Sequence, residues 1–77
     1  MSRLPIVSAR TMERVLGQLG FSRTRQKGGH VFYRHPDGRT TTVLHHAGRD
    51  LSRPLVRSIL QDIKVSPEEF ENLLKQL

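Results

Sequence analysis

The sequence lacks cysteine and tryptophan, and its 77 residues include only one tyrosine and three phenylalanines. The absence of cysteine excludes a disulfide framework and a zinc ribbon. No apolar run approaches the ~20 residues of a membrane span, or the core of a signal peptide. We therefore expect a cytoplasmic protein with one domain over residues 1–77. Its core should be thin, because so short a chain buries only about 60% of the surface that its unfolded form exposes.

Acidic residues are scarce outside the last segment of the chain. The sequence has 13 Lys and Arg against 7 Asp and Glu, for a net charge of +6, and ten of the cations are arginine. Such a basic chain predicts a polyanionic partner. RNA or DNA is favoured over a membrane, because no basic amphipathic helix is present. A solvated basic surface without such a partner is the simpler alternative.

Two segments flanking the middle of the chain have the signals of amphipathic helices. The first helix is expected over residues 9–19, with Ser8 as its N-cap and Gly20 as its left-handed C-terminal residue. The second lies within residues 50–65, behind Ser52 as N-cap. Its apolar stripe is expected to comprise Leu55, Ile59, Leu60 and Ile63, with Val56 beside it.

A third helix is predicted at the C-terminal end. Ser66 is its expected N-cap, Pro67 occupies the first helical position, and Glu69 can close a capping box. Its apolar face is expected to consist of Phe70, Leu73, Leu74 and Leu77.

Three short segments between the first two helices have the composition of β-strands. They cover residues 21–26, 30–35 and 40–46, and hairpin-length links join them, so an antiparallel sheet is expected. The predicted fold class is α+β, in the order α-β-β-β-α-α. The helices should cover one face of the three-stranded sheet, and the other face should be open to solvent.

Alternation along these strands decides which side chains share a face. On the first strand it places Phe21, Arg23 and Arg25 on one side. On the middle strand it separates two sets, and each set contains an aromatic residue. One set is His30, Phe32 and Arg34, and the other is Val31, Tyr33 and His35. Periodicity alone leaves open which set faces the solvent.

Histidines are the groups that can exchange protons near neutral pH, and the sequence has four of them. His35, His45 and His46 could converge with Asp37 across a hairpin. Their spacing matches no metal-binding template, however, and adjacent histidines on a strand point to opposite faces, so no metal site is predicted. No arrangement typical of a nucleophilic enzyme is present, because there is no cysteine and helix capping accounts for most of the serines.

His30 is the strongest candidate for a catalytic residue. It follows Gly28 and Gly29, and glycine is expected where a backbone must come close to a ligand. Beside an RNA phosphate, its imidazole could take the proton of a 2′-hydroxyl or protonate the leaving 5′-oxygen. An ordinary hairpin loop followed by an exposed histidine is the competing explanation. The cations expected around His30, as donors to phosphate, are Arg23, Arg25, Lys27 and Arg34.

Two longer segments, LGFSRTRQKGGHVFYRHPDGR and VLHHAGRDLSRPLVRSIL, resemble the HicA-type toxins of prokaryotic toxin–antitoxin pairs. The likeness extends from Met12 to about Phe70. It implies a fold similar to a double-stranded-RNA-binding domain and cleavage of mRNA by one histidine, without a metal or other cofactor. It also implies a HicB-type antitoxin that covers the active site. The family's Gly-Ser-His motif falls on Gly28, Gly29 and His30, so the resemblance gives His30 the catalytic role.

The sequence departs from the family pattern at several positions. Gly29 stands where serine is usual, Leu44 replaces a usual proline, and Pro54 stands near a usual glycine. His46 matches a histidine that often closes the third strand. The expected function is a metal-independent endoribonuclease, an mRNA interferase neutralised by HicB. The alternatives are a non-catalytic RNA-binding module with the same fold, and a subunit whose basic face binds an acidic protein.

Overall fold

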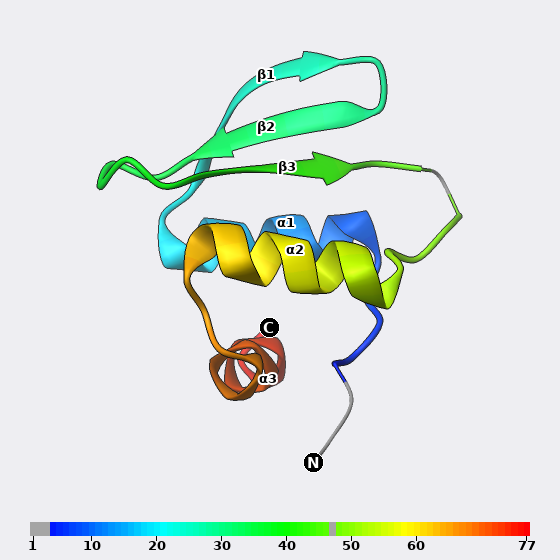
Figure 1. Ribbon diagram of the computed structural model, residues 1–77, viewed down its shortest axis with the longest axis vertical. Coiled ribbons are helices and arrows are strands. Elements are labelled where there is room, and N and C mark those ends of the chain that lie inside the picture. Colours follow the sequence, from blue (N-terminus) through cyan, green and yellow to red (C-terminus); the bar gives the residue numbers. More distant parts are fainter. Residues whose placement is uncertain (1–3, 47) are drawn as a thin grey trace.

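The computed structural model describes residues 4–46 and 48–77, and it confirms the predicted α+β class. The described residues form α1 (Ala9–Leu19), β1 (Ser22–Lys27), β2 (His30–Arg34), β3 (Thr40–Leu44), α2 (Arg53–Ile63) and α3 (Pro67–Lys75) (Figure 1). None of these described helices has the length and apolar character that a bilayer span requires.

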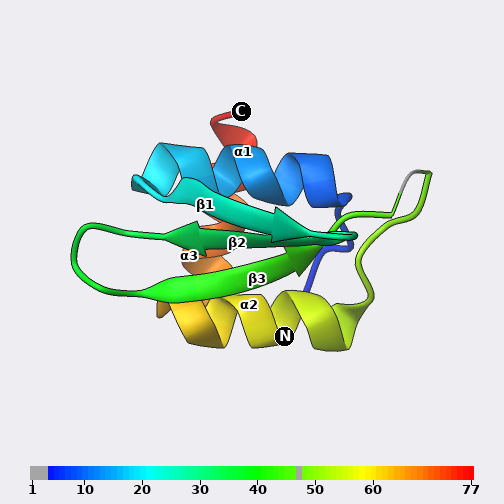
Figure 2. The same ribbon diagram turned by 90° about the horizontal axis from the view of Figure 1, so that it is seen from above.

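The elements are arranged in three layers. The sheet has the strand order β1-β2-β3, and Figure 2 shows it in front of α1 and α2, with α3 behind both helices. The helices α1 and α2 contact β3, whereas α3 contacts α1. The core fills the space between the layers, where Val43 of the sheet, Leu16 of α1 and Phe70 of α3 are all fully buried. The helices therefore lie on one face of the sheet, as predicted.

Each helix begins at the cap that the sequence predicts. The hydroxyl oxygens of Ser8, Ser52 and Ser66 each accept a hydrogen bond from the backbone N–H three residues further along. The cap of α3 is a complete capping box, because the backbone N–H of Ser66 also donates to the Glu69 carboxylate. Gly20 ends α1 with a φ of 99°, a left-handed conformation that favours glycine.

The buried stripe of α2 differs from the prediction at one position. Leu55 is 43% exposed, whereas Val56 is fully buried. At 100° per residue, Leu55 lies about 90° from the centre of the buried stripe, so the packing of the rest of the helix turns it outward. The residues that form the stripe are Val56, Ile59, Leu60 and Ile63. In the C-terminal segment, Leu77 is likewise exposed, beyond the end of α3.

A β-bulge in β1 changes which residues share a side. Arg23 and Arg25 pair with adjacent residues of β2, so Thr24 is an extra residue in β1. Phe21, which precedes the strand, is buried in the core, and Arg23 lies on the same side of the sheet. Arg25 lies on the opposite side. The prediction that Phe21, Arg23 and Arg25 share a side is therefore wrong.

The middle strand β2 shows which of its two sets of side chains faces the solvent. Val31 and Tyr33 are buried against the helices, at 1% and 2% exposure. His30, Phe32 and Arg34 therefore face away from the helices, and their side chains are exposed or half-buried. This assignment places the one histidine that follows the glycine pair on the uncovered side of the sheet.

Candidate active site and nucleic-acid interface

The side of the sheet that the helices leave uncovered, which we term the open face, carries three rows of cross-strand partners. Partners in one row point to the same side of the sheet. Figure 2 looks onto this face. His30 lies in the middle of its row, with a lysine on one neighbouring strand and a leucine on the other. The rows are Lys27–His30–Leu44, Arg25–Phe32–Thr42 and Ser22–Arg34–Thr40.

A two-residue turn, Gly28–Gly29, brings Lys27 and His30 into register. Gly28 has a φ of 58°, and a positive φ at the first turn position fits the type II′ turn that twisted hairpins favour. A Cβ atom added to Gly28 would meet nothing within 4 Å. The backbone conformation at position 28 therefore favours glycine, and the space beside it is open.

Gly29 is closely approached by the chain itself. A Cβ atom at this position would lie 3.2 Å from the carbonyl oxygen of His45 and 3.3 Å from Cδ1 of Leu44. The carbonyl of Gly29 also accepts a hydrogen bond of 2.7 Å from the backbone N–H of His45. The segment that leaves β3 thus packs against the turn that precedes His30, and the lack of a side chain at Gly29 makes room for it.

The His30 side chain is exposed at the start of β2. No hydrogen bond or ion pair with another described residue holds its ring. An imidazole in this position can give a proton to a bound ligand or take one from it.

Three of the four cations predicted around His30 lie exposed on the open face. They are Arg25, Lys27 and Arg34. The guanidinium carbon of Arg25 lies 4.6 Å from the centroid of the Phe32 ring, in a cation–π contact. The fourth cation, Arg23, lies on the other side of the sheet and forms an ion pair with Glu13 of α1.

Arg23 belongs to a polar network that joins α1, β1, β2 and the segment after β3. The hydroxyl of Tyr33 donates to Oε2 of Glu13 at 2.9 Å and lies 3.1 Å from Nε2 of His45. Because the phenol proton goes to the carboxylate, Nε2 of His45 donates to the phenol oxygen. These residues are spread from position 13 to position 45, so no local motif in the sequence indicates the network.

The network shifts the pKa values of three of its members, and the hydrogen bond to Glu13 raises the pKa of the Arg23 guanidinium. Burial and the hydrogen bond to Glu13 raise the pKa of Tyr33 to about 12. The hydrogen bond from Arg23 is the largest influence on Glu13 and lowers the pKa of its carboxyl. Tyr33 is therefore a neutral donor at physiological pH, on the side of the sheet opposite to His30.

The other histidines lie beyond the ends of the strands. β2 ends one residue earlier than predicted, and β3 ends two residues earlier. Nε2 of His35 lies 3.0 Å from the carbonyl oxygen of Leu19, and its Nδ1 accepts a hydrogen bond from the backbone N–H of Asp37. His45 belongs to the Tyr33 network, and His46 is exposed. No group of three His, Asp or Glu side chains that could bind a metal occurs among residues 4–46 and 48–77.

A hollow of about 450 Å³ lies on the sheet around Phe32. Two aromatic residues, Phe32 and Tyr33, line the hollow. Of these, Phe32 is half-buried and lies on the open face. The sequence assigned it no role, because alternation left its orientation undecided. The residues that line the hollow are Thr24, Arg25, Phe32, Tyr33, Arg34, Thr40, Thr41 and Thr42.

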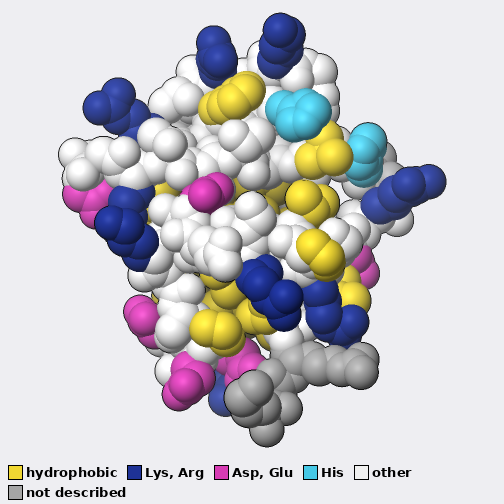
Figure 3. Space-filling view, viewed as in Figure 1, with side chains coloured by type: hydrophobic (Ala, Val, Ile, Leu, Met, Phe, Trp, Pro, Cys, Tyr) yellow, Lys and Arg dark blue, Asp and Glu magenta, His cyan; other side chains and the backbone are white. Residues whose placement is uncertain are grey.

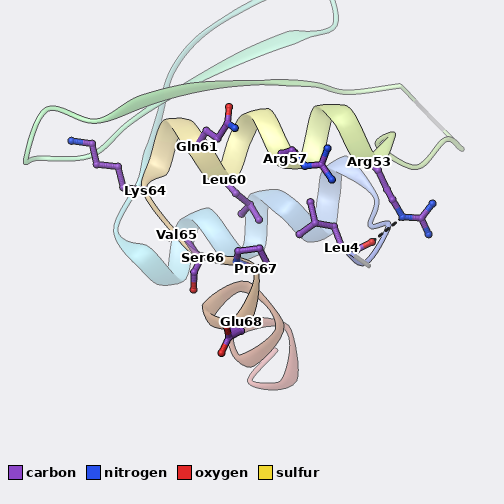
Figure 4. Close-up of a pocket in the computed structure, with 10 residues that line it drawn as sticks. All are labelled: Leu4, Arg53, Arg57, Leu60, Gln61, Lys64, Val65, Ser66, Pro67 and Glu68. Carbon is purple, nitrogen blue, oxygen red and sulfur yellow. Dashed lines mark hydrogen bonds between the residues drawn. The ribbon is translucent and has the colours of Figure 1, made fainter. Parts of the chain in front are cut away.

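A larger groove of about 1100 Å³ lies away from the sheet, between α2 and the start of α3 (Figure 4). At one end of it, Nε of Arg53 donates a hydrogen bond of 3.1 Å to the carbonyl of Leu4. Arg57 and Lys64 also line it, together with apolar side chains such as Leu60. None of the residues predicted for the functional site lines this groove.

Charge is unevenly distributed over the molecule. Figure 3 shows Lys and Arg side chains around the upper end, over the sheet, with histidines beside them, and further Lys and Arg side chains in the lower half. Acidic side chains gather around the lower end in the same view, where α3 contributes Glu68, Glu69 and Glu71. None of the three cross-strand rows of the open face contains an acidic residue, so this face suits a polyanion.

Comparison with known protein families gives a match over most of the chain. Residues 9–65 match the family model described as HicA toxin of bacterial toxin–antitoxin. The matched range includes α1, the three strands, α2 and the segment Gly28–His30, whereas α3 lies beyond it. A search of curated proteins found no match.

Proposed function

The chain belongs to the HicA toxin family of toxin–antitoxin systems, and from this premise we propose that it is an endoribonuclease. It cleaves mRNA in the cytoplasm with His30 as its proton-transfer group, and a HicB-type antitoxin neutralises it. The supporting observation is the position of His30, an exposed imidazole on the open face. It directly follows the Gly28–Gly29 turn and has Lys27 as its partner in register.

The proposed reaction transfers the scissile phosphate to the neighbouring 2′-hydroxyl. His30 takes the 2′-hydroxyl proton while that oxygen bonds to phosphorus, and the bond between phosphorus and the 5′-oxygen breaks. The imidazolium then gives its proton to the 5′-oxygen. The products are a 2′,3′-cyclic phosphate and a 5′-hydroxyl, and the histidine returns to its neutral form. Proton transfer by such a group contributes roughly 10²–10⁴-fold to the rate.

The cations of the open face bind the RNA backbone in this proposal. Lys27 neutralises the charge that builds on the scissile phosphate, because it is the direct partner of His30 in register. Arg25 and Arg34 bind the neighbouring phosphates through their guanidinium groups. The open space beside Gly28 lets the RNA strand approach. Arg23, which is bound to Glu13 on the other side of the sheet, makes no contact with RNA.

The test is His30→Ala in an RNA cleavage assay that contains EDTA. We expect the variant to lose cleavage by at least roughly 10²-fold, to bind RNA nearly as well as the wild type, and to unfold at the same urea concentration. Product analysis should find cyclic phosphate and 5′-hydroxyl ends. His46→Ala, which removes another exposed histidine, is the matched variant. If it abolishes cleavage and His30→Ala does not, the assignment of His30 is wrong.

The alternatives give different results in the same assays. A non-catalytic RNA-binding module would leave RNA whole in EDTA and would bind it with an affinity that falls steeply with salt. A protein-binding subunit would bind an acidic protein and not RNA. The toxin assignment is tested in cells. Expression alone should arrest growth, and co-expression of an antitoxin encoded beside it should restore growth. Unaltered growth without the antitoxin would contradict the assignment.

A further inference from the structure

We propose that Phe32 and the hollow around it bind one unpaired RNA base, next to the phosphate that is cleaved at His30. The identity of the ligand as RNA rests on the proposed function. The inference adds the substrate class, since the RNA must be single-stranded at this position, and it assigns a binding role to Phe32 and Thr42.

The distance along β2 fits this arrangement. Phe32 and His30 project from the open face of one strand, two residues apart. At about 3.3 Å per residue, they are separated by about 7 Å along the strand. One nucleotide of an extended RNA strand can bridge that distance. A phosphate at His30 therefore places a neighbouring base over Phe32.

The side chains of the hollow match the chemistry of a base. Phe32 offers an aromatic face, half-buried and turned away from the core. Thr42 and Thr40 lie on the same face, in the rows of Phe32 and Arg34, and their hydroxyls can donate to or accept from the polar edge of a base. Sheets that expose an aromatic among polar and basic side chains bind single-stranded RNA in this way.

Arg25 covers the ring of Phe32 when RNA is absent. Its guanidinium carbon lies 4.6 Å from the ring centroid. RNA supplies a partner for each member of this pair, since the phosphate attracts the guanidinium and the base can stack on the ring. Binding thus exchanges one contact for two, with Arg25 moving to the phosphate and the base taking its place on Phe32.

This geometry selects against duplex RNA. The faces of bases inside a helix are covered by their neighbours, and recognition of a single base requires it to be unstacked. A base reaches Phe32 only from a single strand, a loop or a bulge.

The test measures stacking directly on the full chain. Short single-stranded RNAs are made with 2′-O-methyl groups, which block cleavage, and with 2-aminopurine at each position in turn. Wild-type protein should quench the fluorescence at one position. Phe32→Leu should remove that quenching and weaken binding roughly 5- to 100-fold. Phe32→Tyr should retain both. Leu55→Ala, which truncates an exposed apolar side chain on α2, is the control and should behave as wild type.

A second measurement does not depend on any variant. The same RNA annealed to its complement should bind wild-type protein about tenfold more weakly or worse, without a change in fluorescence. Equal binding of duplex and single strand would overturn the proposal. Unchanged quenching and affinity in folded Phe32→Leu would also overturn it.

The failure of this inference can be distinguished from the failure of the proposed function. Cleavage is followed separately on unmodified RNA. If wild-type protein and Phe32→Leu cleave and bind equally well, the base subsite is wrong and the role of His30 stands. If the protein stacks a base on Phe32 but never cleaves RNA, the subsite stands and the nuclease assignment is wrong.

Discussion

Tyr33 connects the helical layer to the turn that carries His30. Its hydroxyl donates to Glu13 of α1 and accepts from the His45 ring, and the backbone N–H of His45 donates to the carbonyl of Gly29. The chain of contacts therefore passes from α1 through β2 to the residue that precedes His30. A buried side chain on the covered side of the sheet thus helps to fix the backbone at the open face.

The pKa of Tyr33 can be measured in isolation, because the sequence has one tyrosine and no tryptophan. The ultraviolet absorbance of the phenolate should titrate with a midpoint of about 12 in the folded protein, and of about 10 in concentrated urea. Since the folded pKa is the higher one, this contribution to stability is complete below about pH 10 and is lost as the pH rises toward 12. A midpoint near 10 without denaturant would contradict the observed network.

At the residue scale, the sequence indicates the proposed centre of the candidate site better than its surroundings. His30 stands out because the two glycines before it form a local motif, and their roles in the turn follow from backbone geometry. Simple alternation groups Arg23 with Arg25, and no local signal reveals that Arg23 pairs instead with the Glu13 carboxylate of α1. The orientation of Phe32 depends on which side of the sheet the helices cover, which is a tertiary property.

At the element scale, the starts of the helices could be predicted because caps are local. A serine hydroxyl satisfies a backbone N–H three residues away, and this spacing can be read from the sequence alone. The bulge at Thr24 is different, because it is defined by how β1 pairs with β2. The buried stripe of α2 differs from the prediction at Leu55 for a similar reason, since packing against β3 fixes the rotation of the helix.

The position of α3 predicts that it supports the fold without shaping the open face. Phe70 is fully buried between the helices, so Phe70→Ala should lower the free energy of unfolding by about 3–5 kcal/mol in urea denaturation. Leu77→Ala, at an exposed position beyond the helix, should change it by less than about 0.5 kcal/mol. In conditions where Phe70→Ala remains folded, its RNA affinity should equal that of the wild type. A reduced affinity would show that α3 contributes to the RNA site.

At the scale of the whole molecule, the bulge and the helices divide the cations of the hairpin between two sides. This division predicts different salt dependences for two arginine variants. Each phosphate contact contributes about 0.7 to the slope of log affinity against log salt for a single strand. Arg34→Ala should therefore make that negative slope shallower by about 0.7 in titrations with single-stranded RNA. Arg23→Ala, on the other side and paired with Glu13, should leave the slope unchanged. Equal losses in the two variants would contradict this division.

The outer edge of β1 has a further consequence for the free protein. β1 is the last strand on its side of the sheet, and no other described strand pairs with its outer edge. Such an edge is a template on which a second chain can add a strand and begin to aggregate. Arg23, Arg25 and Lys27 all lie along it and are exposed. Two copies that approach each other edge to edge bring these like charges together, so mutual repulsion opposes the pairing of β1 with its copy in a second molecule.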